Sequence, residues 1–113
     1  MATIKSYTDI EKSRKLAEIL PLESADMVYT ITNGYHTPWI RIEKIDELDK
    51  DDVCAWSLAA LLNILPKSLI YTPNQALDGY CCKNITHDLE TYGDNPVDAC
   101  VAMIEKLHEL KML

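Results

Sequence analysis

The residues best suited to chemistry in this sequence are its cysteines and histidines. Thiols and imidazoles bind zinc, whose structural sites use four such ligands, and Cys81, Cys82, His87 and Cys100 would make one such set. The spacing does not favour zinc, because there is no Cys-x-x-Cys motif and adjacent residues of a strand point to opposite faces. We therefore expect no metal ligands and no cofactor, although the residues alone leave open whether Cys81, Cys82 or His87 binds an ion.

A second kind of chemistry would use a cysteine as a nucleophile, which needs a histidine nearby as its base. Either His36 or His87 could lie near Cys81 or Cys82, so a small cysteine-dependent enzyme is one alternative. The chain has no glycine-framed nucleophile turn. Its three glycines are isolated, which excludes a P-loop and a dinucleotide-binding motif. We expect a protein that is not an enzyme and has no catalytic residue.

An aromatic-rich segment, Tyr35–Trp39, directly follows the dipeptide Asn33-Gly34. Tryptophan and tyrosine dominate the binding energy of protein interfaces, so this segment, if exposed, is a candidate binding surface. Its candidate binding residues are Tyr35, His36 and Trp39. If the segment is instead buried, Trp39 is a core residue, because single large aromatic side chains mostly serve packing.

Composition places the chain among ordinary folded domains and limits its partners. It has 113 residues, 48% of them hydrophobic and 26% charged, which predicts a single domain spanning residues 1–113. Its net charge is −7, and it has only two arginines, so we expect no nucleic acid and no anionic membrane surface as partner. Residues 1–20 carry seven charges and no apolar run, which argues against a signal peptide and favours a cytoplasmic protein with free thiols.

The pattern of caps, stops and apolar spacing predicts three helices and four or more strands. Thr8 and Glu11 form a capping box for a helix over about 9–20, which ends at Pro21. Asp51 and Asp52 are expected to cap a second helix that runs to Leu65. Strands are expected over residues 27–32, 35–42, 69–72, 80–86 and 88–92, and a third helix from Asn95 toward the end of the chain.

This order, α-β-β-α-β-β-α, indicates an α+β fold in which a small antiparallel sheet carries about three helices mainly on one face. Asn33-Gly34 predicts a tight hairpin between the first two strands, and Pro38 places the second of them at a sheet edge or a bulge. A weak internal similarity links Leu16–Pro21 with Leu61–Pro66, so a duplicated unit is possible alongside chance resemblance.

Three segments resemble small uncharacterised proteins encoded by prophages and mobile elements of gut bacteria. The segments are Leu16–Met27, Ala55–Leu62 with Leu65-Pro66, and Gly93–Cys100 through Lys106-Leu107. The last of them also looks loosely like the closing helix of a phage α/β sandwich domain. The resemblance implies a fold and a genetic setting, and it implies no activity and no site residue.

We therefore expect an accessory protein that binds a protein partner or associates with itself. One alternative is an acidic mimic of nucleic acid that binds a host protein through a single acidic segment. The acids concerned are Asp46, Glu47, Asp49, Asp51 and Asp52. Because such binding is electrostatic, it would weaken steeply with salt.

Overall fold

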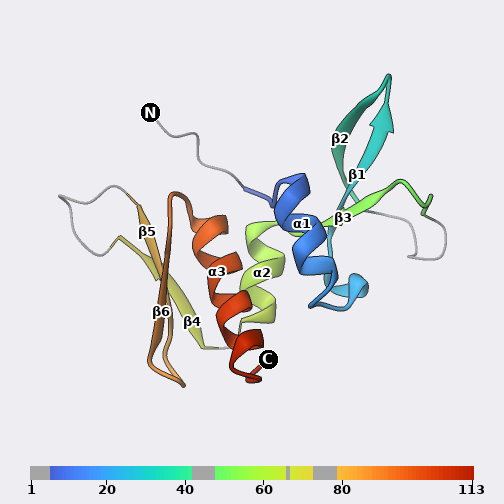
Figure 1. Cartoon of the computed structure of the whole chain (residues 1–113). Coiled ribbons are helices and arrows are strands. Elements are labelled where there is room, and N and C mark those ends of the chain that lie inside the picture. The colour runs from blue at the N-terminus through green and yellow to red at the C-terminus, as the bar shows by residue number, and fades with distance from the viewer. Residues whose placement is uncertain (1–5, 42–47, 66, 73–78) are drawn as a thin grey trace.

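The structure is a computed structural model that describes residues 6–41, 48–65, 67–72 and 79–113 (Figure 1). Its helices are α1 (Ile10–Ala17), the 3-10 helix η1 (Leu22–Ser24), α2 (Leu58–Ile64) and α3 (Pro96–Glu109). Its strands are β1 (Met27–Thr32), β2 (Tyr35–Ile40), β3 (Val53–Ala55), β4 (Ser68–Tyr71), β5 (Tyr80–Asn84) and β6 (Leu89–Gly93). The expected α+β class and the expected order of elements are confirmed.

The strands form two antiparallel sheets of three strands each, with spatial orders β2-β1-β3 and β4-β5-β6. The helices lie between the two sheets (Figure 1). In this arrangement α3 packs against β5 and β6, α2 packs against α3, and α1 packs against β3. No helix among the described residues is long and apolar enough to cross a membrane.

The core gathers where the helices meet, around Trp56, Leu61 and Met103, each of which is completely buried. The Trp56 indole nitrogen donates a hydrogen bond to Ser24 Oγ at 2.9 Å, which satisfies the one polar group of this side chain. Gly93 allows β6 to approach α3 closely, because a Cβ at this position would lie 2.5 Å from the backbone nitrogen of Ala99.

The prediction for the start of the second helix is wrong. Asp51 and Asp52 do not cap it, since Val53–Ala55 forms strand β3 and pairs with β1. The observed cap is Ser57, whose hydroxyl accepts a hydrogen bond from the Ala60 amide at 3.2 Å. The apolar run from Val53 has too little strand-like alternation to reveal this pairing, which depends on a partner more than twenty residues away.

The first helix is also capped one residue later than the capping box predicts. Asp9, not Thr8, is the N-cap, and its carboxylate accepts a hydrogen bond from the Lys12 amide at 2.8 Å. Thr8 is completely buried and joins separate parts of the fold. Its hydroxyl accepts a bond from the Trp56 amide at 3.1 Å and contacts Ser13 Oγ at 2.7 Å.

Candidate functional site

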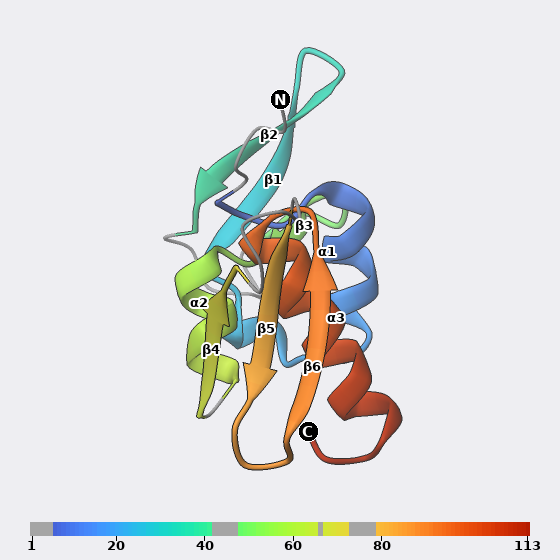
Figure 2. The same cartoon turned by 90° about the vertical axis from the view of Figure 1, so that its left-hand side faces the viewer.

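The β1–β2 hairpin spans residues 27–40, and its outer half is exposed and extends away from the helices (Figures 1 and 2). Its turn residues, Asn33 and Gly34, have φ values of 51° and 82°. Positive φ at both positions defines the type I′ turn, whose twist matches that of the flanking strands, and Gly34 adopts it without steric cost. The hairpin expected from Asn33-Gly34 is thus confirmed, with Thr32 directly opposite Tyr35.

The outer part of the hairpin is a two-stranded ribbon. The third strand, β3, pairs with β1 only at Met27, Val28 and Tyr29. From Thr30 to Thr37 no strand among the described residues lies beside these two in the sheet. A two-stranded hairpin is marginally stable in water without further packing, so a contact with another surface would stabilise this part of the chain.

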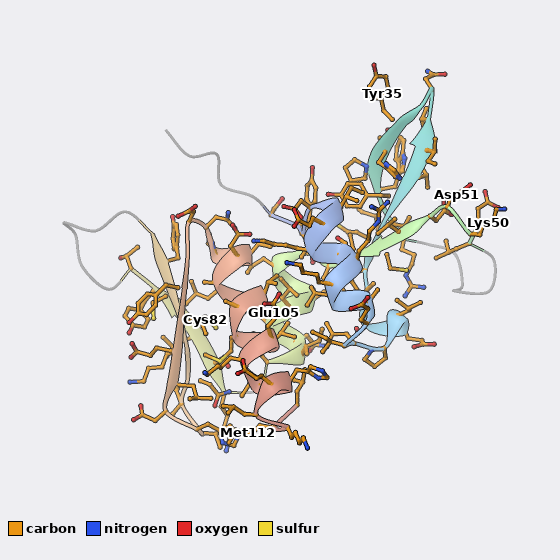
Figure 3. All side chains as sticks on the ribbon, viewed as in Figure 1. Tyr35, Lys50, Asp51, Cys82, Glu105 and Met112 are labelled. Carbon is orange, nitrogen blue, oxygen red and sulfur yellow. The ribbon has the colours of Figure 1, made fainter. Side chains whose placement is uncertain are left out.

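One face of the hairpin carries Tyr35 and Trp39, which lie four residues apart in β2 with Thr37 between them. Residues at this spacing share a face, because side chains alternate along a strand. Tyr35 is 76% exposed and Trp39 is 55% exposed, so both aromatic side chains contact solvent. Figure 3 shows Tyr35 at the far end of the hairpin. Of the two interpretations of this segment, the exposed surface is therefore the correct one, and Trp39 is not a core residue.

His36 lies on the opposite face from the two aromatic residues. It pairs directly with Ile31 of β1, and Ile40 follows on the same face. Ile31 is 50% exposed and Ile40 is 76% exposed, so this face also presents apolar surface. The structure thus brings Tyr35 and Trp39 together and separates His36 from them. Sequence reasoning missed the two isoleucines, although strict alternation from His36 would have pointed to Ile40.

Pro38 limits the hydrogen bonds that the outer edge of β2 can form with another strand. Since Thr32 and Tyr35 close the type I′ turn, alternate residues of β2 direct their backbone groups away from β1, and Pro38 is one of them. The Arg41 amide, three residues further on, points the opposite way and donates to the Asp26 carbonyl at 2.9 Å, as this alternation requires. Proline has no N–H, so the free edge lacks a donor at its centre and pairs poorly with another strand.

The base of the hairpin is fixed to the rest of the chain. The Tyr29 hydroxyl donates to the Thr8 carbonyl at 2.7 Å, and its ring meets that of Tyr7 edge to face. Burial, together with Tyr7 and Asp9, raises the pKa of Tyr29 to about 12. The Arg41 guanidinium donates from Nε to the Ala25 carbonyl at 2.9 Å. These contacts therefore fix the direction in which the hairpin leaves the rest of the chain.

The four cysteines are free and buried, and they do not form one cluster. Cys82 lies on the side of β5 that faces α3 (Figure 3). It shares a hydrogen bond with Cys100, which lowers the pKa of Cys82 and raises that of Cys100. Cys81 points to the other face of the sheet. His87 lies in the exposed turn between β5 and β6. Among the described residues no group of three or more His, Cys, Asp and Glu side chains could hold a metal ion.

The acidic segment forms a turn where it is described. The Asp52 carboxylate accepts a hydrogen bond from the Asp49 amide at 3.0 Å, so this acidic side chain stabilises the turn. Asp49 and Asp51 are exposed. Asp46 and Glu47 lie outside the described residues.

A shallow cleft of about 280 Å³ lies between α1, α3 and the end of β6. Lys12 crosses it to Asp98, with 3.2 Å between the Lys12 Nζ and Asp98 Oδ1 atoms. The other Asp98 oxygen accepts a hydrogen bond from the Asn95 side chain at 2.9 Å, at the start of α3. Both carboxylate oxygens of Asp98 thus hold the start of α3 in place. None of the candidate residues predicted from the sequence lines this cleft.

A scan against protein-family profiles, a search of curated proteins and a search of solved structures each gave no match.

Proposed function

We propose that this chain is a non-enzymatic accessory protein that acts by binding a protein through its β1–β2 hairpin. The observation that carries the proposal is the exposure of Tyr35 and Trp39 on one face of a ribbon that pairs with no further strand in the part of the chain that the structure describes. Large aromatic side chains lose little conformational entropy on binding and contribute much contact area, so they serve as interface anchors.

The position of the hairpin supports the same proposal. Tyr29 and Arg41 anchor its base, so the hairpin leaves the rest of the chain in a defined direction before a partner arrives. Preorganisation of this kind reduces the entropic cost of association. We place the protein in the cytoplasm, where four free thiols suit a reducing compartment, and in a phage or mobile element, on the resemblance described above.

The experiment that tests this function is photo-crosslinking from a single position in lysate of the source cells. A photoreactive phenylalanine analogue replaces Trp39 in one variant and Tyr92 in the control variant. Tyr92 is 62% exposed on β6, so the two positions have comparable access to solvent. We expect protein adducts from position 39 and few from position 92. Equal yields at both positions, or adducts from position 92 alone, would contradict the proposal.

The acidic-mimic alternative makes a different prediction in the same experiment. A partner held by Asp49 and Asp51 would dissociate as salt screens the charges, whereas a partner held by Tyr35 and Trp39 would stay bound. Loss of all adducts at high salt, together with unchanged binding of a Trp39→Ser variant, would favour the acidic mimic.

A further inference from the structure

We propose that the occupant of the aromatic hairpin face is a second copy of this chain, packed face to face across a two-fold axis near Thr37. This inference rests on the proposed function, because it names the partner of the same surface. Three features of the chain support it: the distribution of charge, the order of side chains along β2, and the blocked edge at Pro38.

The hairpin is the uncharged part of a strongly acidic chain. Residues 27–40 include no Asp, Glu, Lys or Arg, so all 18 acidic side chains and all 11 lysine and arginine side chains lie elsewhere. Two copies that each carry a net charge of −7 repel one another over most of their surfaces. Contact through the projecting hairpins avoids charged surface and separates the acidic bodies, and salt screens exposed charges beyond about 8 Å. A basic partner would bind the acidic remainder of the chain instead.

The order of side chains on this face is complementary to itself. Tyr35, Thr37 and Trp39 follow one another on one face of β2. If two copies pack with their β2 strands antiparallel and the axis at Thr37, Trp39 of one copy meets Tyr35 of the other, and the reverse pair forms by symmetry. An interface in which residue i meets j and j meets i is the isologous contact of two-fold dimers. The smaller threonines at the centre leave room for the two aromatic pairs.

The dimer would also supply the layer that the ribbon lacks. Thr30 is half-buried, while Ile31 and Thr32 are exposed, so burial decreases toward the turn. Two sheets packed face to face lie about 10 Å apart, which is the spacing that interdigitated side chains fill. Edge-to-edge pairing of two β2 strands is disfavoured, because Pro38 removes a backbone donor from the middle of the free edge.

Sedimentation equilibrium of the purified full chain tests this inference, over a range from about 1 to 500 µM that covers weak dimers. We expect the mass to rise from that of a monomer toward twice that value. Tryptophan emission gives a second readout. Trp56 is completely buried and Trp39 is 55% exposed, so only Trp39 can lose contact with water as the dimer forms. Its emission should shift to shorter wavelength at the concentrations where the mass increases.

Charge variants at the axis test the geometry. Thr37→Lys and Thr37→Glu each place two like charges face to face, so each should weaken self-association about tenfold or more. An equimolar mixture of the two variants should restore dimers, because it pairs opposite charges. The matched controls are Thr86→Lys and Thr86→Glu, at an exposed turn residue outside the hairpin, which should dimerise as the wild type does. Thermal unfolding followed by circular dichroism identifies any variant that fails to fold.

A chain that stays monomeric at the highest concentration would overturn the inference. Dimers that form equally well in the Thr37 variants would overturn it too, since they would use another surface. Either result leaves the hairpin function to be judged by crosslinking, where adducts to an unrelated protein at position 39 would retain the proposed function and exclude the second copy. If the chain stays monomeric and position 39 also gives no more adducts than position 92, both the second copy and the proposed hairpin function are excluded.

Discussion

Thr8 and Tyr29 connect the hairpin to the core, and the sequence signals only part of this role. Thr8 was expected to cap a helix, and the structure uses its hydroxyl for Trp56 and its carbonyl for Tyr29. A short polar side chain before a helix predicts a cap equally well at Thr8 and at Asp9. The tertiary contacts that decide between them come from residues at least twenty positions away, which a local pattern does not include.

The raised pKa of Tyr29 makes hairpin anchoring sensitive to alkaline pH. Its pKa lies near 12 in the folded chain against an ordinary value of 10.0, chiefly because burial disfavours the phenolate. The protonated phenol therefore stabilises the fold fully below pH 10, and this contribution is lost as the pH rises toward 12. We expect wild-type stability to fall more steeply than that of Tyr29→Phe over this range. Parallel curves in urea unfolding at several pH values would contradict the assignment.

The cysteines offer a second test at single residues. Cys81, Cys82 and Cys100 are completely buried, and Cys54 is 7% exposed. We expect iodoacetamide to modify the native chain slowly, Cys54 first, and to modify all four thiols rapidly in denaturant, as followed by peptide mass spectrometry. Although the hydrogen bond from Cys100 lowers the pKa of Cys82, burial limits its reactivity. Rapid selective modification of native Cys82 would instead favour the cysteine-enzyme alternative.

The secondary-structure elements show where a local pattern is sufficient. The start of α3 at Asn95 is both predicted and observed, with Asn95 as its cap and proline at its first position, and the Asn33-Gly34 turn is likewise predicted and observed. These signals act within a few residues. Strand β3 is different, because three residues become a strand only by pairing with β1. The division of the strands into two sheets, with the helices between them, likewise depends on contacts that no local pattern contains.

Pro38 is expected to keep the free edge of β2 from pairing with another strand. Replacing it with threonine restores an N–H on the free edge of β2 and keeps a residue that favours strands. We expect Pro38→Thr to form species larger than a dimer in sedimentation velocity, through edge-to-edge pairing. Thr30→Val is the matched control, since Thr30 belongs to the central strand and adds no donor at the edge. If Pro38→Thr and the control sediment as the wild type does, the edge is protected by something other than Pro38.

The order of helices and strands along the chain is repeated once, but the sheet topology does not support a duplication. A helix followed by three strands occurs twice, which agrees with the internal similarity of Leu16–Pro21 and Leu61–Pro66. However, the first strand of the first unit, β1, is central in its sheet, whereas the first strand of the second unit, β4, is at an edge. A duplicated unit would keep the order of its strands, so the topology favours chance similarity.

The net charge predicts how salt acts on self-association. Between about 0.1 M and 1 M salt the screening length falls from roughly 10 Å to 3 Å, which weakens repulsion between two acidic bodies. We expect the dimer to tighten several-fold over this range in sedimentation equilibrium. The mixture of Thr37→Lys and Thr37→Glu is a control, because salt also screens the attraction between its two opposite charges, so its dimer should tighten less with salt than the wild-type dimer does. A wild-type dimer that weakens with salt would indicate that charged groups hold it together.

The most direct test of the hairpin as the binding surface is quenching of Trp39 fluorescence by acrylamide. Trp56 is completely buried, so in the free chain the accessible part of the emission comes from Trp39, which is 55% exposed. The measurement compares the free chain with the associated chain, either at high concentration or with the protein that position 39 crosslinks. We predict that association protects Trp39 and removes most of the quenching. A Trp39 that remains as accessible in the associated chain as in the free chain would contradict the hairpin interface.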